Sequence, residues 1–229
     1  MKTGSPKPEA PIPKPGVRSP ASNPRPSTSP LLVLISAPSG GGKTTLCQQL
    51  LVARPEMERA LTCTTRDPRP GEKEGVDYYF LDAALFLKRV QAEHFLENAI
   101  VYGHSYGTLK SEVLGKLRQG RDVLLNVDVQ GAATIRERTR EDRELKRALV
   151  SVFLTPPSVG ILEERLRKRG TDSAAVIQKR LSVARQEIAQ WKNFDYLLIS
   201  DSIKEDLRRM LVIVEAEKLR AARALPLEL

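Results

Sequence analysis

Eight consecutive residues have the types and spacing of a phosphate-binding loop: Ala37, Pro38, Ser39, Gly40, Gly41, Gly42, Lys43 and Thr44. The glycines allow successive backbone N–H groups to point at one anion, and the start of a following helix adds its positive dipole end. Lys43 is then placed to reach the β- and γ-phosphates, and the Thr44 hydroxyl to ligate Mg²⁺. The run therefore predicts a site for a nucleoside triphosphate and its metal ion.

The loop departs from the general pattern G-x-x-x-x-G-K-[ST] at one position, because Ala37 stands in place of the first glycine. An alanine at this position costs little conformational free energy if its φ is negative, and much if its φ is positive. The alternative interpretation, a flexible glycine linker, would not predict the Lys43-Thr44 pair or the apolar run 31–35 directly before the loop.

A second candidate phosphate site lies in the proline-containing stretch 62–72. Prolines keep the backbone extended, and in a polyproline-II turn of three residues Arg66 and Arg69 would project from one face. Two guanidinium groups on one face can clamp a phosphate, and the hydroxyls of Tyr78 and Tyr106 could add donors. The alternative is a solvated basic turn.

The elements around these residues alternate between strands and helices. Apolar runs predict strands at 31–35, 123–127, 150–154 and 196–199. Apolar residues at helical spacing predict helices at 43–54, 159–170, 177–188 and 207–219. Short β-like pieces are expected at 61–65, 78–81 and 100–102, with short helices capped by Asp82 and Ser111. Alternation around a phosphate loop predicts an α/β fold with a parallel, doubly wound sheet.

Residues 1–30 are rich in proline, serine and lysine and contain few apolar side chains. Such a segment buries too little surface to offset the entropy of ordering, so a disordered, partly polyproline-II tail is predicted. With five basic residues and one acidic residue, it carries +4 of the formal net charge of +9. The rest of the chain shows no basic stripe interleaved with aromatic residues, so the tail is the one place where nucleic-acid binding could reside.

The bulk composition indicates a cytoplasmic protein. No apolar run approaches the ~20 residues that a bilayer-spanning helix needs, and the N-terminus has no apolar signal segment. Cys47 and Cys63 have neither metal-binding nor redox spacing, and Cys47 falls on the predicted helix after the loop, where a small buried residue is expected. With 229 residues, 41% of them hydrophobic, the chain can form one α/β domain, with or without a small insertion.

Motifs along most of the chain resemble those of the guanylate kinase family. Besides the phosphate loop they are Thr64-Thr65-Arg66-x-Pro68-Arg69-x-Gly71-Glu72, Gly75-x-Asp77-Tyr78-x-Phe80, Phe95-Leu96-Glu97, Tyr106-Gly107-Thr108, Asp128-x-Gln130-Gly131, Pro156-Pro157-Ser158, Arg165-Leu166-x-x-Arg169-Gly170-Thr171-Asp172 and Ile177-x-x-Arg180-Leu181. They occur in the family's order between about residues 31 and 221. So many ordered matches make the resemblance highly specific.

The resemblance implies the P-loop NTPase fold, with helices on both faces of the parallel sheet, an inserted mixed GMP-binding region and a helical lid. The guanylate kinase domain would span 31–229, with its core at 31–60, 109–155 and 193–229, the GMP-binding region at about 61–108 and the lid at about 156–192. The implied activity is transfer of the γ-phosphate of Mg·ATP to GMP, and to dGMP. Transfer would be direct and in line, without a covalent enzyme intermediate.

The resemblance also implies roles for single residues. The GMP phosphate would be held by Arg66, Arg69, Tyr78 and Tyr106. The guanine pocket would be lined by Thr62, Glu97, Thr108 and Asp128. The transferring group would be neutralised by Lys43 and by the lid arginines Arg165, Arg169 and Arg180. For Glu97 there is an independent physical reason, because guanine presents N1–H and N2–H₂ donors side by side and a carboxylate accepts from both, whereas adenine has an acceptor at N1.

Three positions depart from the family's usual residues. Ala37 is the first, and close family members tolerate it. Asn126 stands where the family commonly has an aspartate, so Asp128 is the candidate to position Mg²⁺ through water in addition to contacting guanine. Ser200 stands where the family tends to have an asparagine near the adenine, which implies a looser preference for the donor base.

Two other functions fit parts of the sequence. A kinase of the same scaffold that acts on a sugar phosphate or another nucleotide would lack the guanine-specific carboxylates, yet Glu97 and Asp128 are both present. A binding module, similar to the catalytically dead guanylate-kinase-like domains of scaffolding proteins, would lack a working phosphate loop. In this chain the loop residues from Gly40 to Thr44 are intact. GMP and ATP are therefore the expected small-molecule partners. The protein is expected to be a monomer or a homodimer.

Overall fold

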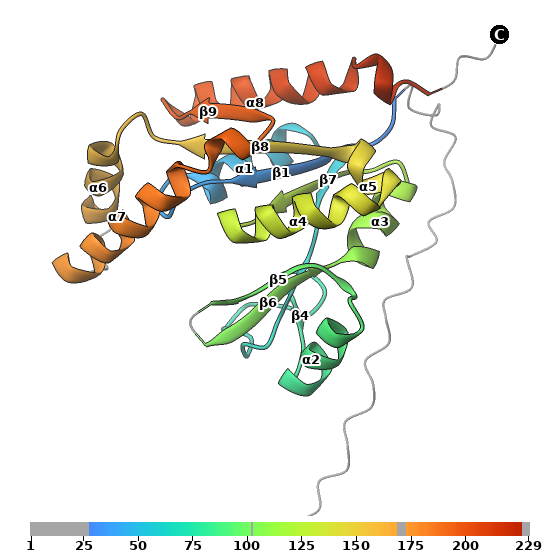
Figure 1. Ribbon diagram of the computed structural model, residues 1–229, viewed down its shortest axis with the longest axis horizontal. Helices are drawn as coiled ribbons and strands as arrows, with labels where there is room; N and C mark the ends of the chain where they lie inside the picture. The colour runs from blue at the N-terminus through green and yellow to red at the C-terminus, as the bar shows by residue number, and fades with distance from the viewer. Residues whose placement is uncertain (1–27, 102, 169–172, 226–229) are drawn as a thin grey trace, which may run out of the picture.

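The computed structural model describes residues 28–101, 103–168 and 173–225 (Figure 1). A parallel sheet of five strands lies at its centre, in the order β2-β7-β1-β8-β9. Its strands are β1 (Leu32–Ser36), β2 (Met57–Arg59), β7 (Asp122–Asn126), β8 (Leu149–Thr155) and β9 (Tyr196–Ile199). The predicted α/β fold with a parallel sheet is confirmed.

Helices cover both faces of this sheet, because the side chains of a strand point alternately to the two faces. In β1, Val33 and Ile35 belong to the core under α1 and α8, whereas Leu32 and Leu34 belong to the core under α3, α4 and α5. Figure 1 shows α8 on one side of the sheet and α4 on the other. The helices are α1 (Lys43–Ala53), α3 (Lys110–Arg118), α4 (Val129–Glu141), α5 (Arg143–Ala148) and α8 (Ile203–Lys218).

A second sheet of four strands, in the order β4-β3-β6-β5, lies on the α4 side of the central sheet (Figure 1). Its strands are β3 (Thr62–Thr64), β4 (Tyr79–Phe80), β5 (Phe95–Val101) and β6 (His104–Leu109). Helix α2 (Ala83–Gln91), capped by Asp82 as predicted, packs on this sheet through Phe86, whose ring stacks on Phe95 with centroids 4.5 Å apart. The second sheet thus has a small core of its own.

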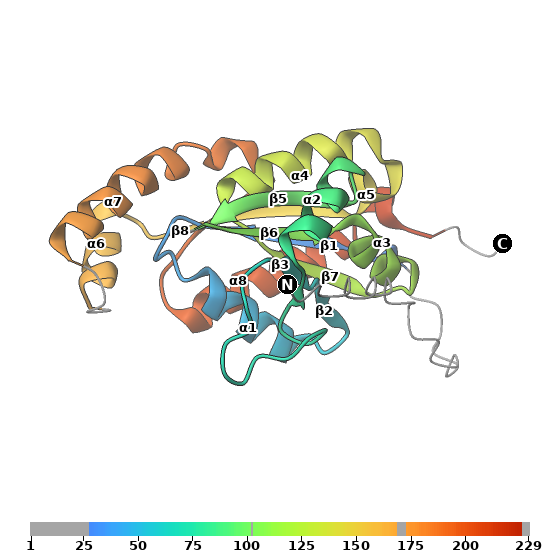
Figure 2. The same ribbon diagram turned by 90° about the horizontal axis from the view of Figure 1, so that it is seen from below.

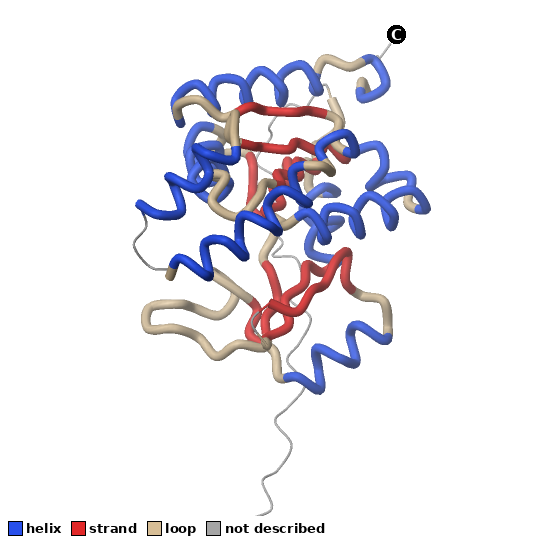
Figure 3. Tube along the Cα trace, turned by 60° about the vertical axis from the view of Figure 1, so that its left-hand side comes forward, coloured by secondary structure: helices blue, strands red, loops and turns tan. Residues whose placement is uncertain are grey.

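Helices α6 (Val159–Lys168) and α7 (Ala174–Ile188) form an arm at one end of the central sheet, as Figures 2 and 3 show from two further directions. They pack against each other through a separate apolar cluster that includes Leu162, Leu166 and Ile177. The predicted end of the first of these helices, near Gly170, falls outside the described residues. Within the described ranges, no helix is long and apolar enough to span a membrane.

Several predictions need correction. Ser111 is not a cap, because α3 begins at Lys110 and Leu109 occupies the cap position. Helix α8 begins at Ile203, earlier than predicted, with the Ser202 side chain as its cap. Four elements have no predicted counterpart: β2, β6, α4 and α5. The reason in α4 is composition, since the stripe that it buries consists largely of small or polar residues, with Val129 and Ile135 as its large apolar side chains.

Residues 28–30 also correct the prediction of a disordered tail over 1–30. Thr28 forms an antiparallel bridge with Ala224. The backbone N and the hydroxyl of Ser29 both donate to the Arg223 carbonyl oxygen, at 2.9 and 3.1 Å. Arg223 is itself buried and ion-paired with Glu217, so this end of the chain is fixed to the end of α8. The remainder of the predicted tail, 1–27, lies outside the described residues.

Candidate functional site

The phosphate loop, residues 37–44, leaves β1 at the carboxyl end of the parallel strands. Strand β1 lies between β7 and β8, which come later in the chain on opposite sides of it. Ligands of open α/β sheets bind where the strand order reverses in this way. The loop therefore occupies the position at which this fold class binds its ligands.

The loop has the conformation that its glycines permit. Gly40 and Gly42 have φ of +87° and +96°, and the Gly41 N–H donates to the Pro38 carbonyl oxygen at 2.9 Å. A Cβ on Gly40 would lie 3.0 Å from a Leu166 methyl carbon, so α6 rests directly on the loop. Ala37 has no positive φ, because Glu93 alone among the described non-glycine residues does. The replacement of the first glycine is thus free of backbone strain.

Lys43 is the first residue of α1, and its Nζ donates a hydrogen bond to the Val127 carbonyl oxygen at 2.6 Å. Burial lowers the pKa of Lys43, and Coulomb attraction to the nearby Asp128 partly offsets this by raising it. The ammonium group therefore lies in a mostly dry setting where the loop meets the residues that follow β7.

Glu187 reaches the phosphate loop, although no motif predicted a role for it. It lies in the last turn of α7, and its Oε2 accepts a hydrogen bond from the Ser39 backbone N–H at 3.4 Å. Burial raises the pKa of Glu187, the Ser39 N–H lowers it, and Asp128 raises it again. An acidic side chain in the last turn of a helix opposes the helix dipole, and this is the sequence signal that could have singled it out.

Three of the residues predicted to clamp a phosphate lie close together in the structure: Arg66, Tyr78 and Tyr106. The guanidinium carbon of Arg66 lies 5.6 Å from the Tyr78 ring centroid, and the two tyrosine rings are 6.3 Å apart. Arg66 Nη2 donates to both oxygens of Glu72, at 2.9 Å each. The same carboxylate accepts the Arg69 backbone N–H at 2.8 Å, and this bond and Arg66 lower the pKa of Glu72. Glu72 thus organises the clamp, a role that its motif alone did not predict.

Thr62, Thr108 and Glu97 lie side by side across β3, β6 and β5. Thr108 Oγ1 donates to Glu97 Oε1 at 2.8 Å, and the Glu97 residue is only 7% exposed. Burial raises the pKa of Glu97, the Thr108 hydrogen bond lowers it, and Asp128 raises it further. A buried carboxylate with so few fixed donors is a site that can accept hydrogen bonds from a ligand.

Asp128 has a structural role as well as a place in the site. It is the cap of α4, and its Oδ1 accepts the Gly131 N–H at 2.7 Å. A Cβ on Gly131 would lie 3.3 Å from Glu97 Oε2 and 3.4 Å from Asp128 Oδ1, so the two carboxylates converge on this glycine. Asn126, two residues earlier, is exposed at the end of β7.

Arg165 is the lid arginine that the structure places at the phosphate loop. Its Nη1 lies 4.0 Å from where a Cβ on Gly42 would stand, and its Nη2 donates to Ser200 Oγ at 3.3 Å. Arg180 lies on α7. Arg169 lies outside the described residues.

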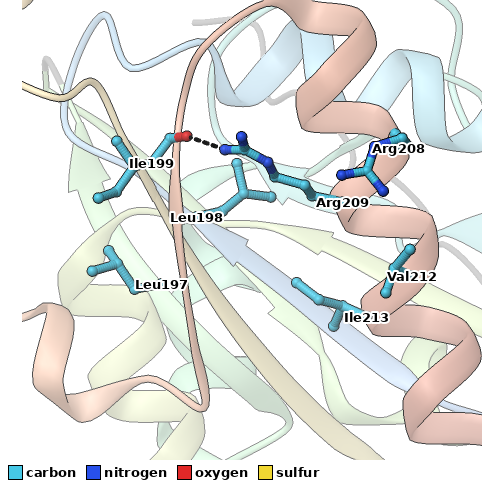
Figure 4. A pocket seen from close by; sticks show the side chains of 7 residues that line it. All are labelled: Leu197, Leu198, Ile199, Arg208, Arg209, Val212 and Ile213. Carbon is cyan, nitrogen blue, oxygen red and sulfur yellow. Dashed lines mark hydrogen bonds between the residues drawn. The ribbon is translucent and has the colours of Figure 1, made fainter.

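A cavity of about 250 Å³ lies away from these residues, between β9 and α8 (Figure 4). It is lined by Leu197, Leu198, Ile199, Arg208, Arg209, Val212 and Ile213. Arg209 Nη1, from α8, donates to the Ile199 carbonyl oxygen of β9 at 2.9 Å, the dashed line in Figure 4. Because no residue of the predicted nucleotide site lines it, the cavity is separate from that site.

Comparisons with known proteins agree with one another. A sequence model of the family described as guanylate kinase matches residues 29–217. The guanylate kinase of Coxiella burnetii is 45% identical over 189 residues, which are 82% of this chain and 88% of the relative. That of Carboxydothermus hydrogenoformans is 42% identical over 193 residues, 84% of this chain and 91% of the relative.

A solved structure supports the same assignment at the level of the fold. The crystal structure of guanylate kinase from Anaplasma phagocytophilum superposes with a TM-score of 0.66 at 31% sequence identity. The match covers 87% of this chain and 91% of that one. Sequence and fold therefore agree with the motifs, and the chain belongs to the guanylate kinase family.

Proposed function

We propose that this protein phosphorylates GMP to GDP, and dGMP to dGDP, at the expense of ATP. One arrangement carries the proposal: Lys43, at the phosphate loop, donates to the Val127 carbonyl oxygen, and the carboxylates of the next residue, Asp128, and of Glu97, on the second sheet, converge on Gly131. A site for a triphosphate and a site for an acceptor base are then adjacent, which direct transfer between two bound nucleotides requires. Membership of the guanylate kinase family supports the same function.

Glu97 would select the acceptor base. Guanine offers N1–H and N2–H₂ donors on one edge, and a carboxylate can accept from both. Adenine would place its N1 lone pair against the buried carboxylate, leaving both groups without a donor. Mismatches of this kind in a buried polar pocket can discriminate by roughly 10⁴-fold. Thr62 and Thr108 lie beside Glu97 and would complete the pocket.

The clamp would hold the phosphate of GMP. Arg66 Nε is buried without a hydrogen-bond partner among the described residues, so a donor is available there. Tyr78 and Tyr106 lie beside this guanidinium and offer hydroxyl donors. Arg69 would join from the same loop, which Glu72 fixes by its bonds to both arginines. Charge-assisted donors from several side chains are what a phosphate dianion requires.

The donor nucleotide would bind with its phosphates in the loop. Backbone N–H groups of residues 37–44 would surround them, and Lys43 would exchange the Val127 carbonyl oxygen for phosphate oxygens. The residues present fit Mg²⁺, because Thr44 and Asp128 offer the oxygen ligands that this ion prefers, directly or through water. When bound, Mg²⁺ would neutralise developing charge on the phosphates.

Transfer would proceed in line from the γ-phosphate to the GMP phosphate, without a covalent enzyme intermediate. Lys43 and the lid arginines Arg165, Arg169 and Arg180 would neutralise the transferring group. Lid closure would exclude water and so suppress hydrolysis of ATP. The cytoplasmic location and the choice between a monomer and a homodimer stay predictions from the sequence.

The decisive test is a coupled assay of ADP release with Mg·ATP and a panel of GMP, dGMP, AMP, CMP, UMP and dTMP. Turnover confined to GMP and dGMP is the expected result. Turnover with a different acceptor, or with none of them despite ATP binding, would overturn the proposal.

Glu97→Gln should raise KM for GMP and relax the discrimination against AMP, because one acceptor oxygen becomes a donor. A lost hydrogen bond to a charged group is worth about 1.5–3 kcal/mol, which corresponds to an increase of roughly ten- to hundredfold. Steady-state kinetics measure both changes, with the exposed Glu137→Gln on α4 as the matched control. Unchanged GMP kinetics would remove Glu97 from the base pocket.

The same variant should be more stable than the wild type at neutral pH. Because burial raises the pKa of Glu97, the folded protein binds this proton more tightly than the unfolded chain, and ionised Glu97 lowers the free energy of unfolding. Thermal melts should show a Tm higher by a few degrees, since 1 kcal/mol corresponds to roughly 2–4 °C in a chain of this size. The difference in Tm between the variant and the wild type should disappear as the pH falls toward 4.5, the ordinary pKa of glutamate. A gap independent of pH would contradict this account.

Glu187→Gln should lower KM for ATP severalfold. The Glu187 carboxylate takes a backbone N–H of the phosphate loop and repels an incoming triphosphate, whereas glutamine keeps the acceptor oxygen without the charge. The comparison is made at low ionic strength, with the exposed Glu164→Gln on α6 as the control. A rise in KM for ATP would show instead that the charge of Glu187 supports nucleotide binding.

A further inference from the structure

The start of α8 holds a buried carboxylate that the reaction described above does not use. Asp206 is 4% exposed and accepts two hydrogen bonds, from the Ser200 hydroxyl at 2.8 Å and from the Asp201 backbone N–H at 3.0 Å. Ser200 follows β9 directly and is itself buried. Its backbone N–H donates to the Thr155 carbonyl oxygen at 2.7 Å, which fixes Ser200 beside the end of β8.

The Ser200 hydroxyl connects this carboxylate to the lid. Ser200 Oγ accepts a hydrogen bond from Arg165 Nη2 at 3.3 Å, and Arg165 Nη1 approaches Gly42 of the phosphate loop. A serine hydroxyl has one proton to donate and two lone pairs. Because a carboxylate only accepts, the Ser200 hydroxyl directs its O–H at Asp206 and leaves its lone pairs for the guanidinium. The carboxylate therefore sets the direction in which the hydroxyl faces.

We propose that Asp206, acting through Ser200, is a positioning residue that holds Arg165 over the phosphate loop. The inference rests on the proposed function, in which Arg165 neutralises the phosphoryl group during transfer. A charged group that is already aligned costs no reorganisation when the reaction occurs, and a small misplacement lowers the rate strongly.

A purely structural role for Asp206 makes different predictions. An acidic residue in the first turn of a helix complements the helix dipole, and the bond from Asp201 N–H closes the turn before α8. Loss of that role alone would lower the free energy of unfolding and leave the kinetics of the folded enzyme unchanged. A positioning role would lower kcat in a protein of nearly unchanged stability.

The variant Asp206→Asn separates the two roles. A backbone N–H can only donate, so the amide oxygen of the substituted side chain must face Asp201 and its NH₂ must face Ser200. The turn keeps its bond, whereas the bond to the Ser200 hydroxyl is reversed. We expect kcat to fall about tenfold, KM for GMP to stay within about twofold, and Tm to change by only a few degrees. Wild-type kcat in this variant would overturn the proposal.

A double-mutant cycle tests whether Asp206 acts through Ser200. Ser200→Ala should lower kcat to a similar extent, and Asp206→Asn in that background should cause no further loss, because residues that act as a unit are not additive. Full additivity would overturn the connection. The exposed Asp201→Asn is the matched control and should behave as the wild type. If Asp206→Asn does not fold, Ser200→Ala decides: a lower kcat at unchanged Tm supports the proposal, and an unchanged kcat overturns it.

Failure of this inference can be told apart from failure of the proposed function. Hydrogen exchange of α6 in the nucleotide-free protein requires no turnover, and it should be faster in Asp206→Asn than in the wild type, with α4 unchanged as the internal reference. A wild type without GMP turnover would refute the proposed function alone. A wild type that turns over GMP, with equal α6 exchange and equal kcat in the variant, would refute the positioning role alone.

Discussion

The position of Asp128 is the constraint on which the two halves of the site depend. Its carboxylate caps α4, and the helix in turn places Gly131 where Glu97 can approach to within contact distance. The same carboxylate acts on Lys43 across the gap to the phosphate loop. One side chain thus lies close to both regions, the phosphate loop end of the central sheet and Glu97 of the second sheet.

Local signals were enough for the centre of the fold. The apolar run before the loop and the glycines in it predicted β1, the loop and α1, because strand, turn and helix start are each set by neighbouring residues. Helix α4 escaped prediction because the stripe that it buries has few large apolar residues. Strand β6 escaped it because its sequence, His-Ser-Tyr-Gly-Thr-Leu, shows no apolar alternation, although it pairs with β5 directly before it in the chain. Ser111 has the chemistry of a cap, but strand pairing through Leu109 decides where α3 begins.

The residues of the candidate site also divide into those that the sequence predicted and those that it did not. Motifs and residue types predicted Arg66, Tyr78 and Tyr106 as a group, and the chain does bring them together. The roles of Glu187 and Asp206 were not predicted. An acidic residue in the last turn of α7 marks Glu187 as unusual without identifying its partner, and Asp206 has the position of an ordinary acidic residue in the first turn of α8. Glu187 bonds to a loop residue 148 positions away. A pair so distant in sequence has no local period or spacing, so only the folded chain, with α7 beside the loop, reveals it.

The close contact between the phosphate loop and α6 restricts which residues can replace Gly40. The loop backbone at this residue has a positive φ of +87° and is covered on one side by Leu162 and Leu166 of α6. Two independent requirements, conformational and steric, therefore act on a single position. A side chain that could adopt the positive φ would still need the ends of Leu162 and Leu166 to move aside slightly. Drift at this residue is accordingly limited more severely than nucleotide binding alone would demand, and compensating changes would have to arise in the lid.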